Sequence, residues 1–585
     1  MSTSAAPRWP LPPVLVIGAG PVGQTTALLL ARHGVPTVVL DRRPERDRAG
    51  SRALCQQRDV LDVWESVGAG RRIADEGVTW TTARTFHRDA ELFAHTFAEP
   101  GRPTFPPFVN LSQARTEQIL DERIADEPLV DLRWGHDVVG VERAADGVTV
   151  TVDGGERVAG SFAVVCTGAR SDALRALLGV TFEGTSFDDR FLICDVRADL
   201  PGWVAERRFH FDPPGNPGRQ VLVHPCPDST FRIDWQVPAD HDLAAETASG
   251  ALDARIRGVI GDVDHEVVWS SVYRFHSRVA DRMRCGRVLL AGDAAHLVSP
   301  FGARGLNSGV ADAENAAWKI TWVGHGWAPE ELLESYHAER HAAAMENIAV
   351  TTATMEFLVP RDAEQERARA EVLAAAATDP AARARVDSGR LSEPFWYVDS
   401  ALTTADPRRR FAGRPARGEV PPAGPGVLVP DAPVRTPAGP GRLRALARDG
   451  FLLLTGPQAD AGAVAAAAAG APGPVRVLAL AELDGRAGAG SGRRAGSGAG
   501  DRAGAGDGAG AGAGDGAGPT VTAALAARPD EVWLLRPDAH VAAVLAAPGH
   551  DDVVAALARA TARTTTTTPP TRPEEGQDGV LQASR

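Results

Sequence analysis

Three glycines near the start of the chain have the spacing of a nucleotide-binding turn. Gly18, Gly20 and Gly23 follow an apolar run and open an apolar stretch of helical length. Glycines at this spacing permit a sharp turn and a close approach of a pyrophosphate to the backbone, and the first N–H groups of the helix attract its charge. Asp41, 18 residues after Gly23, can accept hydrogen bonds from a ribose diol. The spacing predicts a dinucleotide site that also includes Arg42.

A second glycine-rich segment, far along the chain, favours FAD over other dinucleotides. Residues 287–315 read as a buried strand, an acidic residue, a loop rich in proline and glycine, and a helix. Asp293, directly after Gly292, would hydrogen bond to ribityl hydroxyls. The loop at Pro300 would let an isoalloxazine edge lie on the backbone, and a helix start near Gly305 would favour negative charge on the reduced ring.

The elements that would position these residues alternate between strand and helix. Apolar runs at 14–17 and 37–40 flank a helical stretch at 26–31, which makes a βαβ unit. Runs between about 185 and 280 alternate in polarity like half-buried strands. We therefore expect an α/β fold, with a Rossmann-like FAD-binding domain over residues 1–380. An antiparallel substrate-binding sheet would be inserted at about 75–105 and 185–280.

The remainder of the chain predicts a linker and a third unit. Proline and glycine are frequent within 381–440, which we expect to be a helix followed by a linker. Apolar runs within 441–550 predict a second, smaller α/β domain. Its interior segment 484–519 consists almost wholly of Gly, Ala, Asp, Arg and Ser, which bury too little apolar surface to fold, so we expect a disordered insertion. The tail 551–585 is expected to be disordered as well.

Composition excludes several classes of partner. The net charge of −13 would repel nucleic acid and anionic lipid surfaces. The five cysteines are widely spaced and form no C-x-x-C pair, so neither a disulfide framework nor a metal site is expected. No apolar stretch has the length of a membrane span or the flanks of a signal peptide. We therefore expect a soluble, cytoplasmic protein that binds a small molecule.

The second segment resembles the class A flavoprotein aromatic hydroxylases, of the p-hydroxybenzoate hydroxylase and phenol hydroxylase type. It matches their G-D-A-A-H-x-x-x-P-x-G-x-x-G-x-N-x-G pattern. It departs from that pattern at Ala303 and Arg304, where many relatives place a second glycine. Arg304 would add a charge near the flavin or the substrate mouth. The resemblance covers about residues 13–380 strongly and 420–548 more weakly.

The resemblance assigns further residues to the cofactors. Arg52 matches an arginine that contacts FAD, and Gln113 matches a glutamine that contacts the flavin phosphate or ribityl groups. Gly168 lies in a stretch similar to the family's D-G-A-x-S element, in which Thr167 replaces the aspartate, and Arg170 becomes a candidate for NAD(P)H binding. The full set of predicted cofactor residues is Gly18, Gly20, Gly23, Asp41, Arg42, Arg52, Gln113, Gly168, Gly292, Asp293, Pro300, Gly305, Leu306 and Asn307.

The activity that the resemblance implies is hydroxylation of an aromatic small molecule. Reduced flavin would react with oxygen to a C4a-hydroperoxide, and an electron-rich ring would attack its distal oxygen. The resemblance also implies that NAD(P)H docks transiently, which fits the single dinucleotide fingerprint in the sequence. The family also includes members with a C-terminal thioredoxin-like domain, which residues 533–542 resemble. No cysteine follows Cys285, so this domain would be structural or oligomeric, for instance in a homodimer.

Substrate recognition is expected from the inserted sheet. The resemblance places Pro300 at the flavin front. His224 and Tyr273 are the other catalytic candidates, with Tyr273 the best placed of the three tyrosines to activate a phenol. Further pocket candidates on the same strands are His210, Asp234 and Trp235.

Several other functions remain open at this point. Baeyer–Villiger oxygen insertion or inactivation of an aromatic antibiotic would use the same scaffold. A non-oxygenating flavin reductase or dehydrogenase and a non-enzymatic flavoprotein are further alternatives. The signatures typical of dedicated Baeyer–Villiger enzymes and of flavin halogenases do not occur in the sequence.

Overall fold

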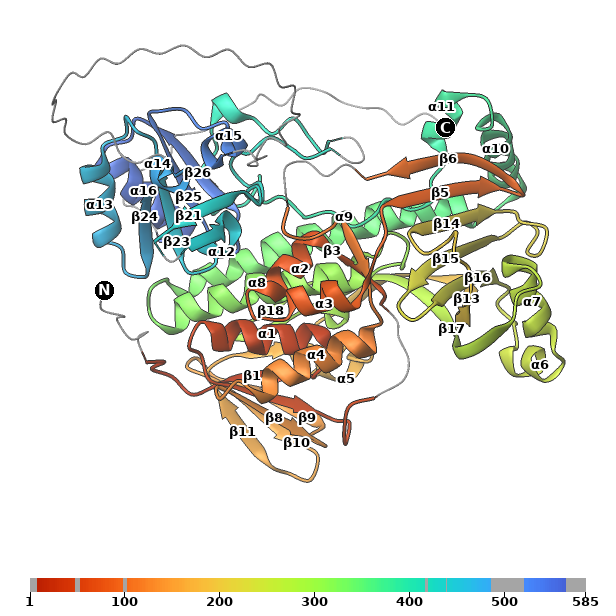
Figure 1. The fold of residues 1–585 in the computed structure, drawn as a ribbon. Helices are drawn as coiled ribbons and strands as arrows, with labels where there is room; N and C mark the ends of the chain where they lie inside the picture. The colour runs from red at the N-terminus through yellow and green to blue at the C-terminus, as the bar shows by residue number, and fades with distance from the viewer. Residues whose placement is uncertain are drawn as a thin grey trace, which may run out of the picture.

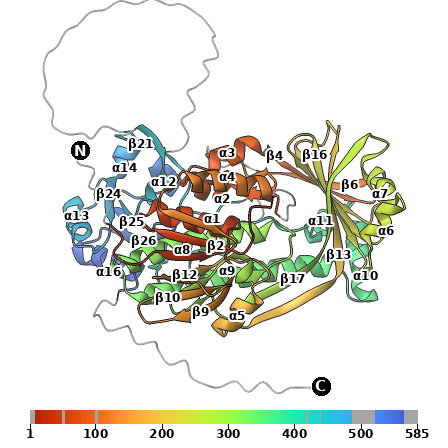
Figure 2. The ribbon, with the colours of Figure 1, turned by 90° about the horizontal axis from the view of Figure 1, so that it is seen from below.

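The computed structural model describes residues 8–47, 53–97, 103–415, 419–437, 439–485 and 520–563. Figures 1 and 2 show three parts in a row, with a large sheet at one end and a C-terminal unit at the other. A nucleotide-binding part lies between them. The long helices α8 (Arg304–Gly324) and α9 (Glu334–Leu358) run through the middle of the molecule (Figure 1).

The nucleotide-binding part is built on a six-stranded sheet in the order β18-β19-β12-β1-β2-β8. Its strands are β1 (Val14–Ile17), β2 (Thr37–Asp41), β8 (Val130–Trp134), β12 (Ala163–Val165), β18 (Arg284–Cys285) and β19 (Val288–Leu290). All neighbouring pairs are parallel except β18 with β19. Strands β1, β12 and β19 are buried along their whole length, as is typical of parallel strands covered on both faces. Because β1 and β19 are parallel, the turns that follow them leave the sheet at the same edge.

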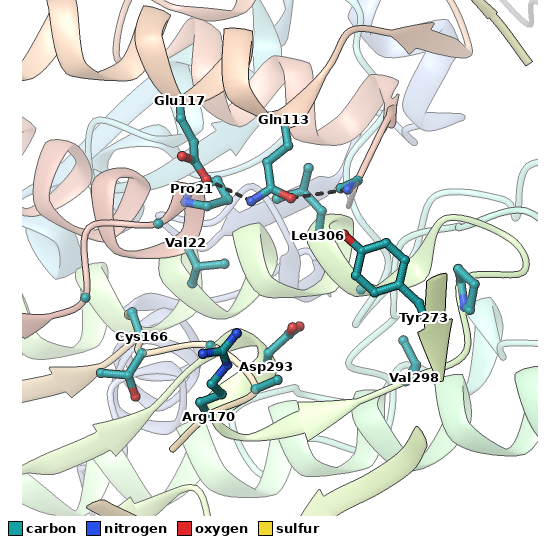
Figure 3. Close-up of a pocket in the computed structure, with 18 of the residues that line it drawn as sticks. Pro21, Val22, Gln113, Glu117, Cys166, Arg170, Tyr273, Asp293, Val298 and Leu306 are labelled. Atoms are coloured by element: carbon teal, nitrogen blue, oxygen red, sulfur yellow. Dashed lines mark hydrogen bonds between the residues drawn. The ribbon is translucent and has the colours of Figure 1, made fainter. Parts of the chain in front are cut away.

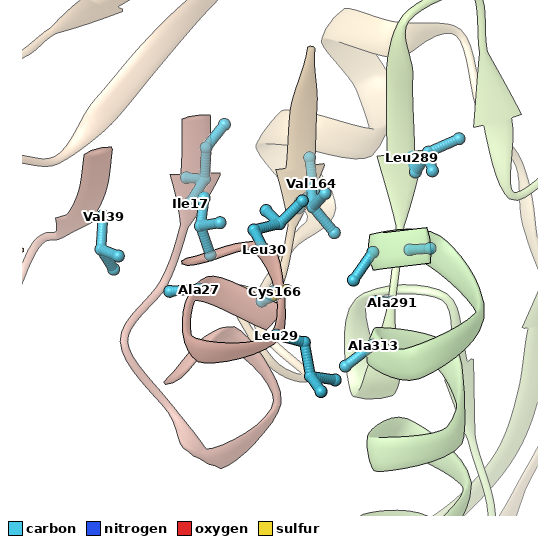
Figure 4. Packing of buried hydrophobic residues seen from close by; sticks show 14 of the residues in the cluster. Ile17, Ala27, Leu29, Leu30, Val39, Val164, Cys166, Leu289, Ala291 and Ala313 are labelled. Carbon is cyan, nitrogen blue, oxygen red and sulfur yellow. The ribbon is translucent and has the colours of Figure 1, made fainter. Parts of the chain in front are cut away.

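Apolar side chains fix this sheet against its helices. Figure 4 shows Leu29 and Leu30 of α1 (Pro21–Arg32) and Ala313 of α8 packed near Ile17 and Val164 of the strands. Helix α4 (Gln113–Ala125) contacts α1. A three-stranded antiparallel sheet adds its valines to the same core, with strands β9 (Val138–Arg143), β10 (Val148–Val152) and β11 (Arg157–Gly160).

The large sheet has eight strands in the order β20-β17-β13-β16-β15-β14-β5-β6. The strands are β5 (Thr82–His87), β6 (Ala90–Thr96), β13 (Phe182–Ala198), β14 (Glu206–Phe211), β15 (Gln220–Cys226), β16 (Thr230–Val237), β17 (His265–Ala280) and β20 (His296–Leu297). Only the pair β5 and β14 is parallel, and it joins the hairpin of β5 and β6 to the strands that come later in the chain. One face packs an apolar layer under α7 (Ala251–Ile260), and α6 (Leu243–Ala248) lies beside α7.

The C-terminal unit contains a four-stranded mixed sheet in the order β24-β23-β25-β26. Its elements are α12 (Leu443–Ala447), β23 (Phe451–Thr455), α13 (Ala461–Ala469), β24 (Val475–Ala479), α14 (Leu480–Leu483), α15 (Val521–Leu525), β25 (Glu531–Leu535), β26 (Val541–Ala546) and α16 (His550–Ala560). One face of the sheet packs against α13, α16 and the tryptophans Trp318 and Trp322 of α8. The unit is therefore docked on the nucleotide-binding part through an apolar contact.

One boundary expected from the sequence is wrong. The tail was expected to begin at residue 551, whereas α16 forms a helix whose buried Val553, Ala556 and Leu557 pack against the sheet. Valine, alanine and leucine at helical spacing make one apolar face, which outweighs the charged residues between them. Residues 486–519, the greater part of the expected insertion, and 564–585 lie outside the described residues.

Shorter elements connect these parts. They are β3 (Cys55–Gln57), α2 (Arg58–Glu65), α3 (Gly70–Glu76), β4 (Val78–Thr79), β7 (Phe108–Asn110), α5 (Asp172–Leu178), α10 (Ala363–Ala375), α11 (Pro380–Arg385), β21 (Pro433–Thr436) and β22 (Gly439–Arg442). Strands β3, β7 and β4 form a small sheet in the order β3-β7-β4. No helix within the described ranges is both long and apolar enough to cross a bilayer.

Candidate active site

The first turn is tightly packed at two glycines and open at the third. Gly18 has φ +105°, and a Cβ there would lie 2.5 Å from the Cys166 carbonyl oxygen. A Cβ on Gly23 would lie 1.9 Å from the carbonyl oxygen of Gly18, so α1 rests directly on the turn. A Cβ on Gly20 would meet no atom within 4 Å. The backbone at Gly20 is therefore free to approach a ligand.

Helix α1 begins at this opening without a side-chain cap. Gly20 is the N-cap residue and Pro21 is the first helical residue, and no side chain accepts a hydrogen bond from the first turn. The first N–H groups of a helix have no partners within the helix, and the dipole places partial positive charge there. This end of α1 suits a pyrophosphate.

Asp41 lies at the end of β2, beside the first turn. Its carboxylate accepts hydrogen bonds from the Ala19 N–H at 2.7 Å and from Arg43 Nε at 2.9 Å. Burial raises the pKa of Asp41, but the hydrogen bonds from Arg43 and Ala19 outweigh it and lower the pKa overall. Asp41 is thus a carboxylate already held in place, with Arg43 as the partner that sequence reasoning missed.

Arg46 is a second missed residue of the first turn. Its Nη1 donates to the carbonyl oxygen of Ala19 at 2.7 Å and to Glu117 at 2.8 Å, and its Nε donates to Asp121 at 2.7 Å. The guanidinium thereby ties the turn to helix α4. No motif marks Arg46, because its function depends on contacts between segments distant in sequence.

Helix α4 also presents Gln113 to the site. Figure 3 shows its amide bonded to Glu117 of the same helix. The N–H of Ala53 donates to Gln113 Oε1 at 3.2 Å, and Gln113 Nε2 donates to Glu117 at 2.8 Å. Arg52, the neighbouring predicted cofactor residue, lies outside the described residues.

The second turn is braced from behind by buried charges. After β19 the chain makes a 3-10 turn at Gly292–Ala294, and the Gly292 N–H donates to Asp312 at 2.9 Å. Asp312 also accepts from His296 at 2.7 Å and from Arg340 at 2.6 Å. Burial alone would raise the pKa of Asp312, but His296 and Arg340 lower it overall. The bracing holds in place the turn that carries Asp293.

The loop that follows the second turn holds the departure from the family pattern. Ala303 adopts the left-handed conformation with φ +57°, which glycine adopts at no steric cost. Arg304 is buried and donates to Asn347 at 2.7 Å and to the carbonyl oxygens of Arg390 and Leu391 at 3.2 and 3.1 Å. Burial lowers the pKa of Arg304 to about 10.

Both turns line one cavity of about 930 Å³ (Figure 3). Gly20 and Asp293, which are far apart in sequence, therefore face the same space. The predicted residues that line the cavity are Gly18, Gly20, Asp41, Arg42, Gln113, Gly168, His224, Tyr273, Asp293, Pro300, Gly305 and Leu306. Asp234, Arg170 and Thr167 line it as well.

Three predicted cofactor residues lie behind the cavity rather than in its wall. Gly23 allows α1 to pack on the turn, and Gly292 makes the 3-10 turn with φ +60°. The amide of Asn307 accepts from the Gln57 N–H at 3.0 Å and donates to the Cys55 carbonyl oxygen at 3.0 Å. Asn307 thereby holds strand β3 against α8.

One face of the large sheet forms the other end of the cavity. On β16, Arg232 and Asp234 face the cavity, whereas Trp235 packs in the apolar layer on the opposite face. On β14, the cavity residue is Arg207, and His210 lies on the other face, stacked on Phe86 with ring centroids 4.5 Å apart. His210 and Trp235 are therefore not cavity residues, because successive strand residues point to opposite faces.

Several ionisable side chains lie together on this face of the sheet. His224 Nε2 lies 3.8 Å from Asp234 Oδ2, and Arg232 makes two hydrogen bonds to Asp195 at 2.8 and 2.9 Å. Burial raises the pKa of Asp234 to about 7, against the lowering effect of Arg232. Burial lowers the pKa of His224 well below its ordinary value. At neutral pH, Asp234 can therefore accept or release a proton, while His224 is uncharged.

Aromatic rings surround these polar groups. Phe191 and Phe275 are stacked with centroids 4.6 Å apart, and Phe301 meets Phe191 edge to face at 5.3 Å. All three line the cavity, as do Tyr273 and Trp80. This lining suits a flat aromatic molecule.

The chain belongs to the FAD binding domain family, which matches residues 12–351 and thus more than half of the chain. The residues present fit FAD, because the uncapped end of α1, the open position at Gly20 and the braced turn at Asp293 meet at one cavity. The enzyme is accordingly a flavoprotein monooxygenase with FAD as its cofactor.

Two of three named relatives are a hydroxylase and a monooxygenase, and the third is a synthase. The chain is 30% identical over 402 residues to a 3-(3-hydroxy-phenyl)propionate/3-hydroxycinnamic acid hydroxylase of Mycobacterium sp. (strain JLS), which covers 66% of this chain and 68% of the relative. It is 34% identical to the rifampicin monooxygenase of Streptomyces venezuelae, over 59% of this chain and 71% of the relative. It is 35% identical to the dialkyldecalin synthase of Streptomyces rugosporus, over 58% and 72%.

Solved structures show the same fold. The flavin-dependent monooxygenase PieE, in complex with FAD and substrate, superposes with a TM-score of 0.75 at 23% identity. The match covers 94% of this chain and 99% of that chain. Aklavinone-11 hydroxylase gives a TM-score of 0.72 at 24% identity over 94% and 99% of the two chains. At this identity the likeness concerns the fold alone.

Proposed function

We propose that this enzyme hydroxylates an aromatic small molecule with a phenolic or polyketide-type ring, using NAD(P)H and dioxygen. The observation that carries the proposal is that the two turns and the ionisable, ring-lined face of the large sheet enclose one cavity. FAD, when bound, supplies the electrons and activates the oxygen. One oxygen atom enters the substrate ring, the other leaves as water, and NAD(P)H provides two electrons.

The chain's own residues bind and orient the ring. Phe191 and Phe275 offer a stacking surface, and Tyr273 and Pro300 line the same cavity. Asp234 holds the phenolic hydroxyl as a hydrogen-bond acceptor or takes its proton, since the pKa of Asp234 is raised to about 7. Neutral His224 donates or accepts a second hydrogen bond. Removing the phenolic proton makes the ring more electron-rich and thus more reactive toward activated oxygen.

The nicotinamide cofactor is proposed to dock transiently beside Gly168. Arg170 lines the cavity at this side, and its guanidinium suits a pyrophosphate. Thr167, which replaces the family's aspartate, bonds to Ser171 at 2.5 Å and keeps the turn closed. The C-terminal unit is proposed to be thioredoxin-like and structural, which its mixed sheet and its lack of cysteines support.

Three other reactions compete with hydroxylation. The rifampicin monooxygenase relative favours oxygenation of an antibiotic, and oxygen insertion into a ring ketone would use the same cavity. One relative is named a synthase and not an oxygenase, so a reaction without oxygen transfer is a further alternative. Products of these reactions differ from a hydroxylated ring in mass and in the position of oxygen.

The deciding experiment is turnover under ¹⁸O₂. A panel of phenols, phenylpropionates and polyketide aromatics is screened for stimulated NAD(P)H oxidation, and products are analysed by mass spectrometry. The proposal predicts one ¹⁸O atom on an aromatic carbon. A product without ¹⁸O would overturn oxygenation, and ¹⁸O within a new ester or lactone would identify oxygen insertion.

A further inference from the structure

A second cavity of about 210 Å³ lies beside the first. It is bounded by β5 and β6 of the large sheet, by β3 and the start of α2, by the segment Ser388–Trp396, and by residues 419–428. The two cavities share two lining residues, Arg207 and Leu391. They are therefore adjacent compartments divided at these two side chains.

The divider is a strap, residues 388–392, which is fastened to the flavin loop. Arg304 donates to the carbonyl oxygens of Arg390 and Leu391, and the Ser392 N–H donates to the Gly302 carbonyl oxygen at 2.7 Å. From the large sheet, Arg207 Nη2 donates to the carbonyl oxygen of Ser388 at 3.1 Å. The strap thus couples the wall between the cavities to the loop at Pro300–Gly305.

The lining of the second cavity suits an aromatic ring. Phe97 and Phe108 meet edge to face at 5.3 Å, and His95 meets Phe97 edge to face at 4.9 Å. Trp80, which lines the first cavity, stacks on Phe108 at 5.3 Å. An unbroken series of rings therefore leads from one cavity to the other.

A polar atom in the second cavity has no partner. Gln57 is 6% exposed and lines the cavity, and its Oε1 accepts no hydrogen bond from any residue that the structure describes. A buried amide oxygen without a donor is costly unless a ligand or water supplies one. A phenolic hydroxyl is such a donor.

The size and position of the cavity set what it can hold. An apolar cavity of about 150 Å³ accommodates benzene, so 210 Å³ accommodates one substituted ring. Glu419 and Val420 are exposed and also line the cavity, which places this side at the protein surface. The cavity therefore connects the surface with the wall of the first cavity.

We propose that the second cavity is a separate binding site for a single-ring phenol, from which the ring passes to the flavin cavity between Arg207 and Leu391. This inference rests on the proposed function for the identity of the ligand. The hydroxyl is held by Gln57 and the ring by Phe97 and Phe108. Movement of Leu391 and of the Arg207 guanidinium opens the passage.

The test uses the full-length holoenzyme and 4-iodophenol, whose iodine is located in crystals by anomalous scattering. Ala83 lines the second cavity on β5, and Ala83→Phe fills it. Ala94, exposed on the neighbouring strand β6, gives the matched control Ala94→Phe. We expect iodine in the second cavity of the wild type and of Ala94→Phe, and none there in Ala83→Phe.

Kinetics separate an entry site from a dead-end pocket. Binding of 4-iodophenol in the flavin cavity is followed by the change in flavin absorbance after rapid mixing. A blocked entry site slows association and dissociation alike, so the association rate should fall about tenfold in Ala83→Phe while Kd stays constant. Leu391→Ala, which widens the passage, should raise both rates.

The outcomes distinguish this inference from the proposed function. Absence of iodine from the second cavity of the wild type would overturn the site, and unchanged association in Ala83→Phe would overturn its use for entry. If the proposed function fails, no ¹⁸O enters any product, yet the iodine position in the second cavity is unaffected. Flavin content equal to that of the wild type shows that Ala83→Phe is folded.

Discussion

Replacing Asp234 by asparagine should stabilise the large sheet at alkaline pH but not in acid. Burial raises the pKa of Asp234 to about 7 in the folded protein, while its ordinary value is 3.8. The folded state therefore holds the proton more tightly than the unfolded state. The stabilising effect of the neutral carboxyl is fully present below pH 3.8 and is lost as pH rises through 7. Asparagine mimics the neutral form at every pH.

The magnitude follows from the difference between the two pKa values. That difference corresponds to about 4 kcal/mol of folding stability. About 2 to 3 kcal/mol of this stability is lost between pH 5 and pH 8. The side chain of Asp234 is 19% exposed, which reduces the effect toward the lower figure. The Asp234→Asn variant should thus gain about 2 kcal/mol relative to the wild type between pH 5 and pH 8.

Hydrogen exchange of peptides from β15 and β16 measures the opening free energy at both pH values. Asp188→Asn is the matched control, because Asp188 is on β13 of the same sheet and is 91% exposed. The difference in opening free energy between the wild type and Asp188→Asn should be the same at pH 5 and pH 8. A stability difference between wild type and Asp234→Asn that is the same at pH 5 and pH 8 would refute the reasoning. Binding of a phenol should rise with pH through about 7 in the wild type and be independent of pH in the variant.

Two further substitutions test buried contacts, one between α8, α9 and the C-terminal unit and one at the loop after the second turn. Glu339→Gln removes the buried carboxylate that Lys319 and Arg536 share, each at 2.6 Å, and should lower the free energy of unfolding in urea by about 3 to 5 kcal/mol. The control Glu334→Gln changes a side chain that is 67% exposed and should leave the free energy of unfolding almost unchanged. Equal losses of unfolding free energy in the two variants would show that the burial of Glu339 does not matter. Arg304→Met should cost about 2 kcal/mol and speed exchange of the Ser392 N–H, whereas unchanged protection of that amide would show that Arg304 does not hold the strap.

The positions of the two turns could be predicted because each depends on local geometry. The glycine spacing from Gly18 to Gly23 requires a turn that only glycine permits, and Asp293 follows a continuous apolar run that reads as a buried parallel strand. Two such strands in one parallel sheet end at the same edge, so their turns must meet. These features predicted the nucleotide-binding part, whereas the family followed from the resemblance of the second segment to a known pattern.

The residues of the substrate end were harder to predict because their direction depends on strand register. His210 and Trp235 were chosen for their side-chain chemistry, yet Phe209 and Phe211 alternate with His210 and face the interior. The same alternation identifies Arg207 as an inward residue. Arg46 lacks any local signal, since its partners lie in other segments of the chain. Arg304 stood out as a departure from the family pattern, but its burial against Asn347 and residues 390–391 could not be read from that pattern. The helix α16 shows that a short apolar face can order a charged terminal stretch.

The most direct test of the central claim is titration of the flavin-free protein with FAD. The wild type should bind one FAD per chain. Gly20→Ala, whose new Cβ would meet no protein atom, should keep the fold and its thermal stability but weaken FAD binding at least about tenfold. Asp293→Ala should weaken it similarly through the other turn. Full FAD affinity in both variants, with folded protein in each case, would contradict the claim that these two turns hold one flavin.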